Sequence, residues 1–230
     1  MDIKVFEKFP VTAGFSTKPA DGKTYRDQLV QEAKDGELIV RPCQTHSSNV
    51  YVVTEPDLED APYLELEDTD ALVTDLKGVT LTSLHGDCIP VWAYDPKRRV
   101  IGLAHSGWKG TADCIAAELI YAMTEEYSCN TEDIHVYIGP GIGFCCFEVE
   151  QDVVDVFLDN MPWSEEYMLN RKNGKYAIDL KGIIAEQVQI EGVPEENVEI
   201  SGECTCCNPE KFWSYRRDKD SKRMLAYIKQ

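Results

Sequence analysis

Short apolar segments recur through the first half of the chain. They are rich in Val, Ile, Leu and Thr and are separated by turn residues such as Lys77-Gly78 and Asp95-Pro96, a pattern typical of β-strands. Because the connection after Tyr94 is short, the strands on either side of it are predicted to form an antiparallel hairpin. The six predicted strands are Leu38–Val40, Asn49–Thr54, Ala71–Asp75, Val79–Leu84, Ile89–Tyr94 and Val100–His105.

A helical period follows this run of strands. Apolar residues recur at intervals of three and four, which predicts an amphipathic helix. We expect this helix to begin near residues 109–111, with Thr111 or Asp113 as its cap. The apolar positions that set the period are Ile115, Leu119, Ile120 and Met123.

The second half of the chain mixes both patterns. Helices are predicted over Val153–Leu158 and Ile183–Ile190, and strands over Ile134–Ile138, Val198–Ile200 and Met224–Ile228. Because strands come in runs rather than in strict βαβ alternation, the fold class is predicted to be α+β, with layered mixed and antiparallel sheets and flanking helices. One domain is expected over residues 1–230, and the acidic stretch 55–70 is expected to be a solvated loop or an irregular segment.

Composition and charge narrow the class of protein. Hydrophobic residues make up 43% of the 230 residues, which is enough for a folded core and excludes intrinsic disorder. Lys and Arg number 23 against 41 Asp and Glu, so the formal net charge is −18. Nucleic acid is therefore not expected as a partner, because phosphate binding needs a basic face.

No segment approaches the roughly 20 apolar residues of a spanning helix, and no apolar stretch follows the first residues as in a secretory signal. The sequence thus predicts a cytoplasmic protein without a membrane partner. The nine cysteines are an odd number. In that compartment they are expected to be free thiols or metal ligands rather than a disulfide framework.

Histidines and cysteines mark the candidate chemistry. His46 and His105 lie at strand ends beside small polar residues, where functional side chains concentrate. His85 and Cys88 lie in a polar break between two apolar strands. Two imidazoles and one thiolate, His46, His105 and Cys88, would form a three-ligand metal site with an open fourth position. The alternative is that each is an ordinary hydrogen-bonded loop residue.

Two further motifs leave alternatives open. Cys204-Thr205-Cys206-Cys207 is similar to half of a zinc ribbon but lacks a second pair at ribbon spacing. Cys145-Cys146 would complete four ligands only if the fold brought them there, and buried apolar thiols are the alternative. The glycine-rich turn 139–143 lacks the lysine of a phosphate loop. It is either a tight turn or a place where backbone N–H groups, near Gly141, approach a substrate.

Basic residues stand out against the negative net charge. Arg and aromatic residues alternate over residues 211–217, and such a segment either stacks on a nucleotide or packs its aromatic residues inward as a helix. Arg41, near His46 in the sequence, is a second local cation that an anionic substrate could use.

Several motifs occur together in a familiar order. The sequence resembles the YfiH family, also called the polyphenol oxidase or laccase-domain family, over roughly residues 11–228. The resemblance implies a compact layered α+β fold, distantly similar to a bacterial toxin's cysteine-hydrolase fold. The segments that carry it are Gln44-Thr45-His46, Thr69–Thr74, Gly86–Val91, Ala104–Gly110, Ile138–Gly143, Cys146–Val149, Cys204-Thr205 and Phe212–Asp218.

The resemblance also implies a metal site of His46, Cys88 and His105, with zinc as the metal. Copper is less expected, because four histidines are too few for the three copper centres of a multicopper laccase. Family members are credited with phosphorolysis of adenosine, inosine and methylthioadenosine, and with adenosine deamination. The implied partners are a small nucleoside and phosphate.

Roles for individual residues follow as expectations. Cys88 and Asp87 are expected to be catalytic, with Asp87 in proton transfer, and His85 is either a further acid–base group or a packed neighbour. Arg41, Gly141 and Arg217 are expected to contact the substrate. Residues 19–22 lack the longer Gly-rich stretch that is common at this point in the family, which bears on substrate preference.

Three other functions compete with this interpretation. A hydrolase with Cys88 as its nucleophile would edit peptidoglycan precursors and would not need a metal. A copper polyphenol oxidase would need bound copper. A binding protein with a vestigial site would not need Cys88 for its biological effect.

Overall fold

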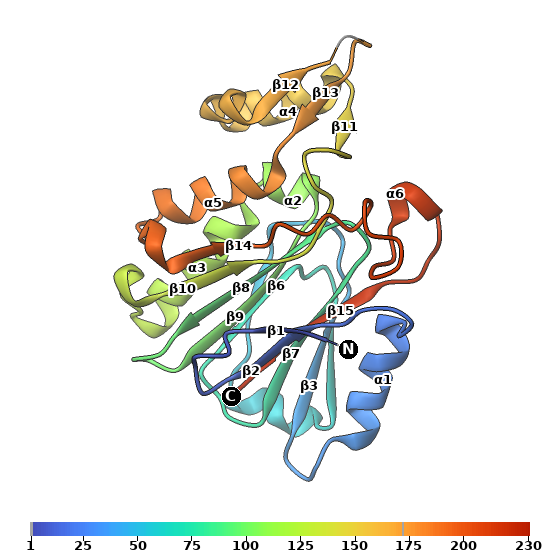
Figure 1. Cartoon of the computed structure of the whole chain (residues 1–230). Helices are drawn as coiled ribbons and strands as arrows, with labels where there is room; N and C mark the ends of the chain where they lie inside the picture. Colours follow the sequence, from blue (N-terminus) through green and yellow to red (C-terminus); the bar gives the residue numbers. More distant parts are fainter. Residues whose placement is uncertain (1, 172) are drawn as a thin grey trace.

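Two six-stranded sheets form the centre of the computed structural model, which describes residues 2–171 and 173–230. The first sheet has the order β1-β2-β15-β7-β3-β5, and the second has the order β14-β10-β8-β9-β6-β4 (Figure 1). The first sheet consists of β1 (Ile3–Val5), β2 (Thr12–Phe15), β15 (Met224–Lys229), β7 (Val79–His85), β3 (Leu38–Pro42) and β5 (Tyr63–Leu66). The second consists of β14 (Val198–Ile200), β10 (His135–Ile138), β8 (Ile89–Asp95), β9 (Val100–Ser106), β6 (Ala71–Thr74) and β4 (Val50–Val52).

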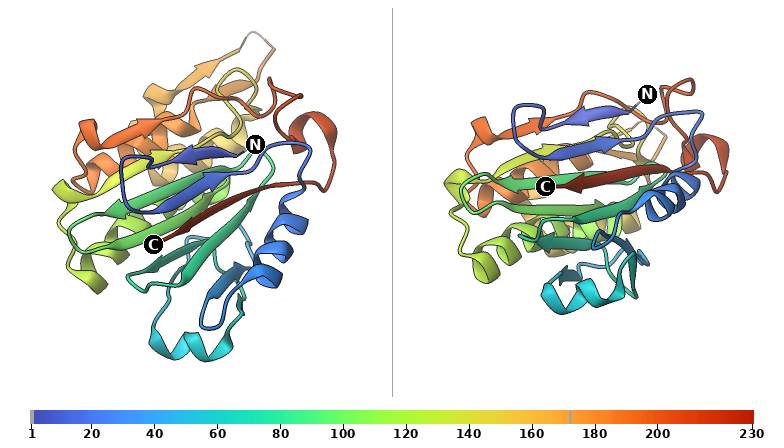
Figure 2. Two further views of the ribbon diagram at one scale, coloured as in Figure 1. Left: turned by 60° about the horizontal axis from the view of Figure 1, so that its bottom comes forward. Right: turned by 90° about the horizontal axis from the view of Figure 1, so that it is seen from below.

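The two sheets lie face to face, as the view from below shows (Figure 2). Side chains alternate along the central strand β8. Trp92 and Tyr94 point into the core between the sheets, together with residues such as Phe15 of β2. Ile89 and Val91 of the same strand belong to a second core, on the helix side of the sheet. This arrangement explains why β8 reads as a continuous apolar run, because both of its faces are buried.

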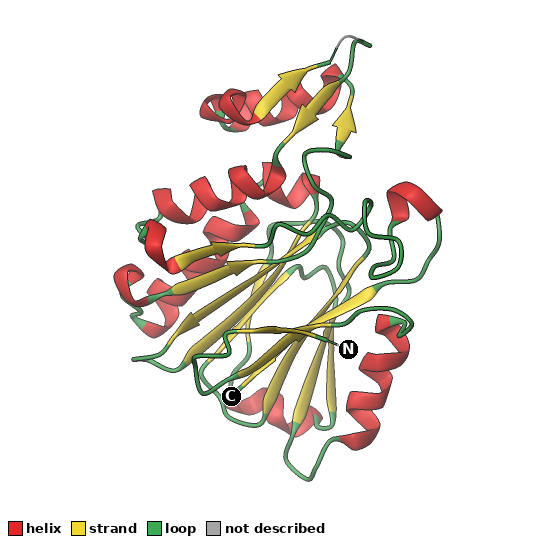
Figure 3. Cartoon of the chain, viewed as in Figure 1, coloured by secondary structure: helices red, strands yellow, loops and turns green. Residues whose placement is uncertain are grey.

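Helices cover the outer faces of this sandwich (Figure 3). The second core joins the second sheet to helix α3 (Ile115–Tyr127) and helix α5 (Leu180–Ile190). Helix α1 (Gly22–Glu32) lies against β15, β7 and β3 of the first sheet. The architecture is therefore the layered α+β fold that the sequence predicts, and β8 and β9 form the expected antiparallel hairpin.

A small third sheet lies beyond α5, at the top of Figure 1. It has the order β11-β13-β12 and packs near helix α4 (Gln151–Asn160) and the 3₁₀ turn η3 (Pro162–Tyr167). Its strands are β11 (Glu148–Val149), β12 (Met168–Asn170) and β13 (Tyr176–Ile178). The remaining short elements are α2 (Trp108–Ala112), α6 (Tyr215–Asp218), η1 (Glu55–Asp60), η2 (Thr131–Asp133) and η4 (Glu195–Asn197).

Three connections cross from the first sheet to the second, and they position the site. They lead from β3 to β4, from β5 to β6, and from β7 to β8. Because β3, β5 and β7 are neighbours in one sheet and β4, β6, β8 and β9 in the other, the three crossings meet at one edge of the sandwich. These crossings hold His46, Asp70 and Cys88, so residues far apart in sequence become neighbours.

The predicted start of the long helix is wrong. Helix α2 ends at Ala112, the chain turns through Cys114 in the left-handed region (φ 60°), and α3 begins at Ile115. Neither Thr111 nor Asp113 caps α3. The Thr111 hydroxyl instead donates to the carbonyl of Gly107 at 2.9 Å, because it lies inside α2.

The acidic stretch 55–70 is only partly irregular, so the prediction of a solvated loop or an irregular segment is wrong in part. It contains η1 and the edge strand β5, which pairs in parallel with β3. Carboxylates on the exposed side conceal the strand pattern, while Leu66 points into the core between the sheets. Strands β1 and β2, helix α1 and the third sheet carry too weak a pattern to be predicted. That residues 1–230 form one domain stays a prediction.

No helix within residues 2–171 and 173–230 combines the length and the apolar character needed to cross a bilayer.

Candidate functional site

Two imidazoles and one thiol converge where the crossings meet. His46 follows β3, Cys88 lies between β7 and β8, and His105 lies near the end of β9. Their nitrogen and sulfur atoms all lie within 4.8 Å of one another, and the Cys88 Sγ is 3.7 Å from Nε2 of His46. The structure thus brings together the three residues that the resemblance implies, while their role as ligands stays a prediction.

A buried carboxylate, Asp70, organises two of these three residues. Its Oδ1 lies 2.8 Å from Nδ1 of His105 and accepts the backbone N–H of His46 at 3.2 Å. Its Oδ2 accepts the N–H and the hydroxyl of Ser47, each at 2.8 Å, and the N–H of Thr45 at 3.0 Å. Because Nδ1 of His105 faces a carboxylate, Nε2 is left as the nitrogen that can coordinate a metal.

Electrostatics favour ionised groups at this point despite their burial. Burial opposes ionisation of Asp70, but hydrogen bonds from His105 and Ser47 outweigh it and lower the pKa of Asp70 to about 2. Burial likewise opposes a thiolate at Cys88, but His105 and then His46 outweigh it and lower the pKa of Cys88 to about 6. Burial lowers the pKa of His105, and the Cys88 thiolate and Asp70 more than compensate, raising it to about 9.

A glycine keeps the space between the donors clear. A Cβ atom on Gly107 would lie 2.5 Å from Cδ2 of His46 and 3.0 Å from the Cys88 Sγ. Any side chain here would displace a donor, since real Cβ contacts are longer than this. The backbone of His46 itself adopts the left-handed region (φ 65°), a conformation that the bonds to Asp70 hold in place.

His85 packs behind the site. It is fully buried, its Nδ1 donates to the carbonyl of Cys88 at 3.1 Å, and its Nε2 lies 2.7 Å from the Ser83 hydroxyl. Burial lowers the pKa of His85 well below its ordinary value. With both ring nitrogens engaged, His85 matches a packed neighbour that positions the Cys88 backbone, rather than an acid–base group.

Asp87 serves as an anchor for loops. Its carboxylate accepts the Thr205 hydroxyl at 2.6 Å, the Ser214 hydroxyl at 3.0 Å and the Arg216 N–H at 2.6 Å. These donors come from the C-terminal part of the chain and attach it to the segment that holds Cys88. The expected proton-transfer role of Asp87 therefore has no support in these contacts, which occupy both carboxylate oxygens.

A cavity of about 370 Å³ opens beside His46 and Cys88. Aromatic and cationic side chains contribute to its lining. Volume and lining both suit a small, flat organic molecule with an anionic companion. Besides His46, Gly86, Asp87 and Cys88, its lining consists of Trp108, Ile142, Phe147, Leu180, Tyr215, Arg216 and Lys219.

The predicted substrate contacts lie elsewhere. Arg41 pairs with Asp27 of α1 at 3.3 Å and lies over the Tyr63 ring. Arg217 donates to the carbonyls of Thr205, Cys206 and Phe212, each at 2.9 Å, and also pairs with Asp218. Neither guanidinium is among the side chains that line the cavity, and these contacts are those of cations that brace the fold. Their expected roles in substrate binding stay predictions.

Gly141 and the basic run also take structural positions. Gly141 bridges to Cys204, and a Cβ there would lie 2.4 Å from the Ile89 side chain, so Gly141 allows two segments to approach closely. In the basic run, Phe212 is fully buried and helix α6 is a single turn. The inward packing of aromatic residues therefore holds for Phe212, while Tyr215 faces the cavity.

Sequence reasoning missed several residues of the site. Asp70 and Gly107 lie inside the motifs that carry the resemblance. The sequence does not show, however, that Asp70 positions His46 and His105 or that Gly107 leaves space between the donors. Arg216 was part of the basic run, but nothing in the sequence separates it from Arg217. Lys219 carried no signal at all.

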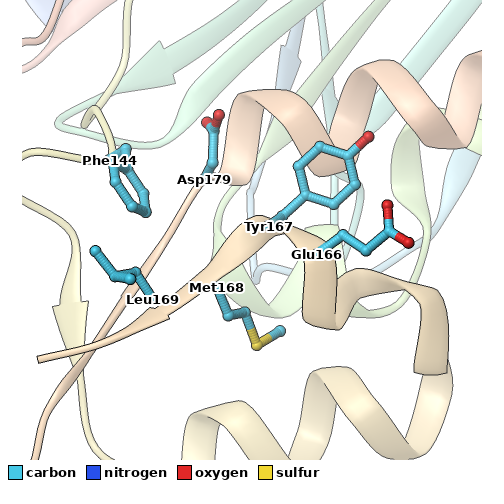
Figure 4. A pocket seen from close by; sticks show the side chains of 6 residues that line it. All are labelled: Phe144, Glu166, Tyr167, Met168, Leu169 and Asp179. Atoms are coloured by element: carbon cyan, nitrogen blue, oxygen red, sulfur yellow. The ribbon is translucent and has the colours of Figure 1, made fainter.

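A second pocket, of about 310 Å³, lies between the third sheet and α5 (Figure 4). Two of its polar groups already have structural partners: Asp179 accepts the Gly182 N–H at the start of α5, and the Tyr167 hydroxyl donates to Glu186 at 3.2 Å. It is distant in the chain from the imidazole–thiol cluster, and it brings together no nucleophile and base.

Four cysteines form a separate group that could hold a metal: Cys145, Cys146, Cys204 and Cys207. The fold thus brings together the two cysteine motifs that the sequence left unconnected.

Comparison with known proteins places this geometry in a family. The sequence profile of the family described as multi-copper polyphenol oxidoreductase laccase matches residues 4–230. The chain therefore belongs to this family, the one that the motifs resemble.

Similar proteins carry more specific names. The chain is 35% identical over 195 residues to the protein named purine nucleoside phosphorylase YlmD of Geobacillus stearothermophilus, covering 80% of this chain and 69% of that protein. The crystal structure of that YlmD matches with a TM-score of 0.85 at 30% identity, over 96% and 92% of the two chains. The crystal structure of the hypothetical protein YfiH of Bacillus licheniformis matches with a TM-score of 0.89 at 31% identity, over 99% and 96%.

Proposed function

We propose that this protein is a zinc-dependent purine nucleoside phosphorylase that also deaminates adenosine. One observation carries the proposal: His46, Cys88 and His105 converge within 4.8 Å beside a cavity large enough for a nucleoside. The name of the similar YlmD protein agrees with this reaction class. The family description names a multi-copper oxidoreductase instead. The chemistry of the donor residues is therefore used to choose between a phosphorylase and a copper oxidase.

The donor set fits a single zinc ion. One thiolate and two imidazoles are preferred zinc ligands, and three protein ligands leave one position for water or substrate. Asp70 holds His105 in the tautomer that coordination needs. A zinc ion bound here would supply Lewis-acid chemistry toward a phosphate oxygen or a water.

The histidine inventory argues against the three copper centres of a laccase. Of the four histidines in the chain, His46 and His105 belong to the cluster. His85 has both ring nitrogens engaged, and His135 packs at a tilt against Phe9, with 4.6 Å between the ring centroids. We therefore favour zinc over copper at the cluster.

The cavity side chains match a purine nucleoside and phosphate. Trp108, Phe147 and Tyr215 offer flat apolar faces for the base. Arg216 is held at the wall, because its Nη1 donates to the carbonyls of Cys146 and Glu148, each at 3.0 Å. Arg216 and Lys219 supply the positive charge that an incoming phosphate needs in an acidic protein.

Both reactions have defined products. In phosphorolysis a phosphate oxygen forms a bond to C1′ of the ribose as the bond from C1′ to the purine nitrogen breaks. The base leaves with a proton, so adenosine gives adenine and ribose 1-phosphate. In deamination, water adds at C6 of the purine and ammonia leaves, so adenosine gives inosine.

The test is product analysis by chromatography. Zinc-loaded protein is incubated with adenosine, with and without phosphate. We expect adenine only when phosphate is present and inosine under both conditions. No conversion under either condition would contradict the proposal.

Matched histidine variants complete the test. His46→Ala removes one donor and is expected to abolish both products. His135→Ala removes a histidine that lies outside the cluster and should leave both activities unchanged. Equal activity in the two variants would mean that the reaction does not depend on His46 and its cluster.

A second candidate is a hydrolase with Cys88 as its nucleophile, favoured by the lowered pKa of that thiol beside His105. This candidate predicts that activity toward a peptidoglycan precursor survives chelation of metal. It also predicts a covalent adduct on Cys88, visible by mass spectrometry. Loss of activity with chelator and no adduct would exclude it.

A further inference from the structure

Four thiols converge at the surface, in a place separate from the imidazole–thiol cluster. The sulfur atoms of Cys145, Cys146, Cys204 and Cys207 all lie within 4.8 Å of one another. Cys207 lies 3.4 Å from the Cys145 sulfur and 3.3 Å from the Cys146 sulfur. Cys204 is buried, whereas Cys145 and Cys207 reach the surface, so an ion can enter without unfolding the chain.

Two tight turns present these sulfurs to one another. Residues 143–147 form a helical turn in which the Phe147 N–H donates to the Gly143 carbonyl at 3.0 Å. Residues 204–208 form a second turn, closed by the Asn208 N–H on the Cys204 carbonyl at 3.2 Å. Within it, Cys204 and Cys207 have the spacing C-x₂-C, which is typical of zinc knuckles.

The backbone joins the two turns directly. The Thr205 N–H donates to the Gly141 carbonyl at 3.0 Å, and the Gly143 N–H donates to the Cys204 sulfur at 3.2 Å. An N–H group aimed at sulfur favours the thiolate. The cluster is therefore set by backbone geometry rather than by chance contacts of flexible side chains.

The distances suit a shared ion better than sulfur–sulfur bonds. Four Zn–S bonds of about 2.3 Å in a tetrahedron separate the sulfurs by about 3.8 Å, close to the separations at Cys207. A disulfide needs about 2.05 Å, and all four thiols are free in the structure.

A positive charge lies beside the cluster. The buried ammonium of Lys181 donates to the carbonyls of Ser201 and Glu203, each at 2.7 Å, which holds it next to the segment that leads into Cys204. Four thiolates around a divalent cation carry a net charge of −2, and Lys181 would offset part of it.

We propose that Cys145, Cys146, Cys204 and Cys207 bind a structural zinc ion, distinct from any ion at His46, Cys88 and His105. Four protein ligands leave no open position, so this ion would stabilise structure and would not bind substrate. It would fasten the turn before Phe147 to the turn that holds Thr205. Thr205 bonds Asp87 and Phe147 lines the cavity, so the ion would fix one wall of the candidate site.

The experiment counts zinc per chain by mass spectrometry of the metal in protein purified under reducing conditions. We expect two zinc ions in the unaltered protein and one in the double variant Cys145→Ser, Cys207→Ser. The control Cys206→Ser changes a thiol of the same turn outside the group of four and should keep two. The double variant His46→Ala, His105→Ala should keep one, so failure of the phosphorylase proposal would not affect this result.

Cobalt substitution identifies the ligands. Cobalt bound to the His46→Ala, His105→Ala variant should give the intense thiolate-to-cobalt absorption of a four-sulfur site. If the cysteine variants do not fold, titration of the His46→Ala, His105→Ala variant with a mercurial thiol reagent should release its one zinc ion in step with the thiols.

Three results would overturn the proposal. The first is that the His46→Ala, His105→Ala variant retains no zinc. The second is a disulfide within the group of four in reduced protein, detected by peptide mass spectrometry. The third is an iron–sulfur chromophore in place of zinc.

Discussion

Replacement of Asp70 by asparagine tests how the site is held. Asp70 is 1% exposed, and six donors from Thr45, His46, Ser47 and His105 surround its two oxygens. An amide keeps the shape but has one oxygen and one NH₂ group, so at least two donors lose their acceptor. The charge is lost as well.

The size of the effect follows from the pKa of Asp70, which falls from 3.8 to about 2 in the folded protein. At about 1.36 kcal/mol for each pKa unit, the carboxylate stabilises the fold by about 2.5 kcal/mol at neutral pH. Donors left without an acceptor add to the loss. We expect Asp70→Asn to lower the free energy of unfolding by about 3 kcal/mol.

The pH dependence has a defined sign. Because the pKa is lower in the folded state, the stabilisation is complete above the ordinary pKa near 4 and is lost as the pH falls toward 2. The difference between the unaltered protein and Asp70→Asn should therefore be constant between about pH 4 and 6, below the range in which His105 titrates, and shrink below about pH 4.

The assay is urea unfolding of chelator-treated protein, so that a bound metal does not contribute. Asp68→Asn is the matched control: Asp68 lies two residues away, is exposed, and accepts the Thr45 hydroxyl and Asn49 Nδ2. Because water can replace both bonds at the surface, this variant should change stability by about 0.5 kcal/mol or less. A loss below about 1 kcal/mol for Asp70→Asn, or an equal loss in both variants, would refute the reasoning.

Three further variants test the cavity and the core. Gly107→Ala places a Cβ 2.5 Å from the His46 ring and should weaken zinc binding at that site at least tenfold, measured by competition with a chelating dye, with the fold unchanged by circular dichroism. Tyr215→Ala should raise the KM for adenosine roughly tenfold through lost stacking, whereas Tyr121→Ala, exposed on α3, should not change the KM. Trp92→Ala empties the core between the sheets and should destabilise the protein by about 3–5 kcal/mol in urea unfolding.

The central strands could be predicted because both of their faces are buried. Residues such as Val91 and Trp92 face different cores, so their segments read as apolar runs without interruption. Elements at the edge of the fold could not be predicted in this way. Strand β5 and helix α1 bury little surface, and their polar residues leave no period that a sequence pattern can reveal.

The break before α3 shows a second limit. Apolar spacing predicts the helix that contains Leu119, but it does not report that Cys114 adopts the left-handed region. A single backbone residue of this kind depends on tertiary packing and leaves no mark on periodicity. The prediction of a helix around Leu119 is therefore confirmed, whereas its start lies at Ile115 rather than near residues 109–111.

Side-chain roles within a motif depend on contacts that span the chain. Arg216 and Arg217 are adjacent and identical in type, but α6 directs one to the cavity and the other to the carbonyls of Thr205 and Cys206. The same holds for the four thiols, since Cys145 and Cys207 meet only because the backbone joins their turns at Gly141.

The C-terminal segment, from Thr205 to Arg217, holds the backbone beside Cys88 in place. Its residues Thr205, Ser214 and Arg216 direct three donors at Asp87, and Asp87 precedes Cys88 in a left-handed conformation (φ 92°) that the donors hold. A segment that looks like a nucleotide-binding run is thus mainly a brace for the Cys88 thiol. Replacement of Thr205 by valine or of Ser214 by alanine, each of which removes a side-chain donor to Asp87, should therefore weaken metal binding at His46 and Cys88 before it changes substrate affinity. Lys219, which lines the cavity without joining this network, should show the opposite order.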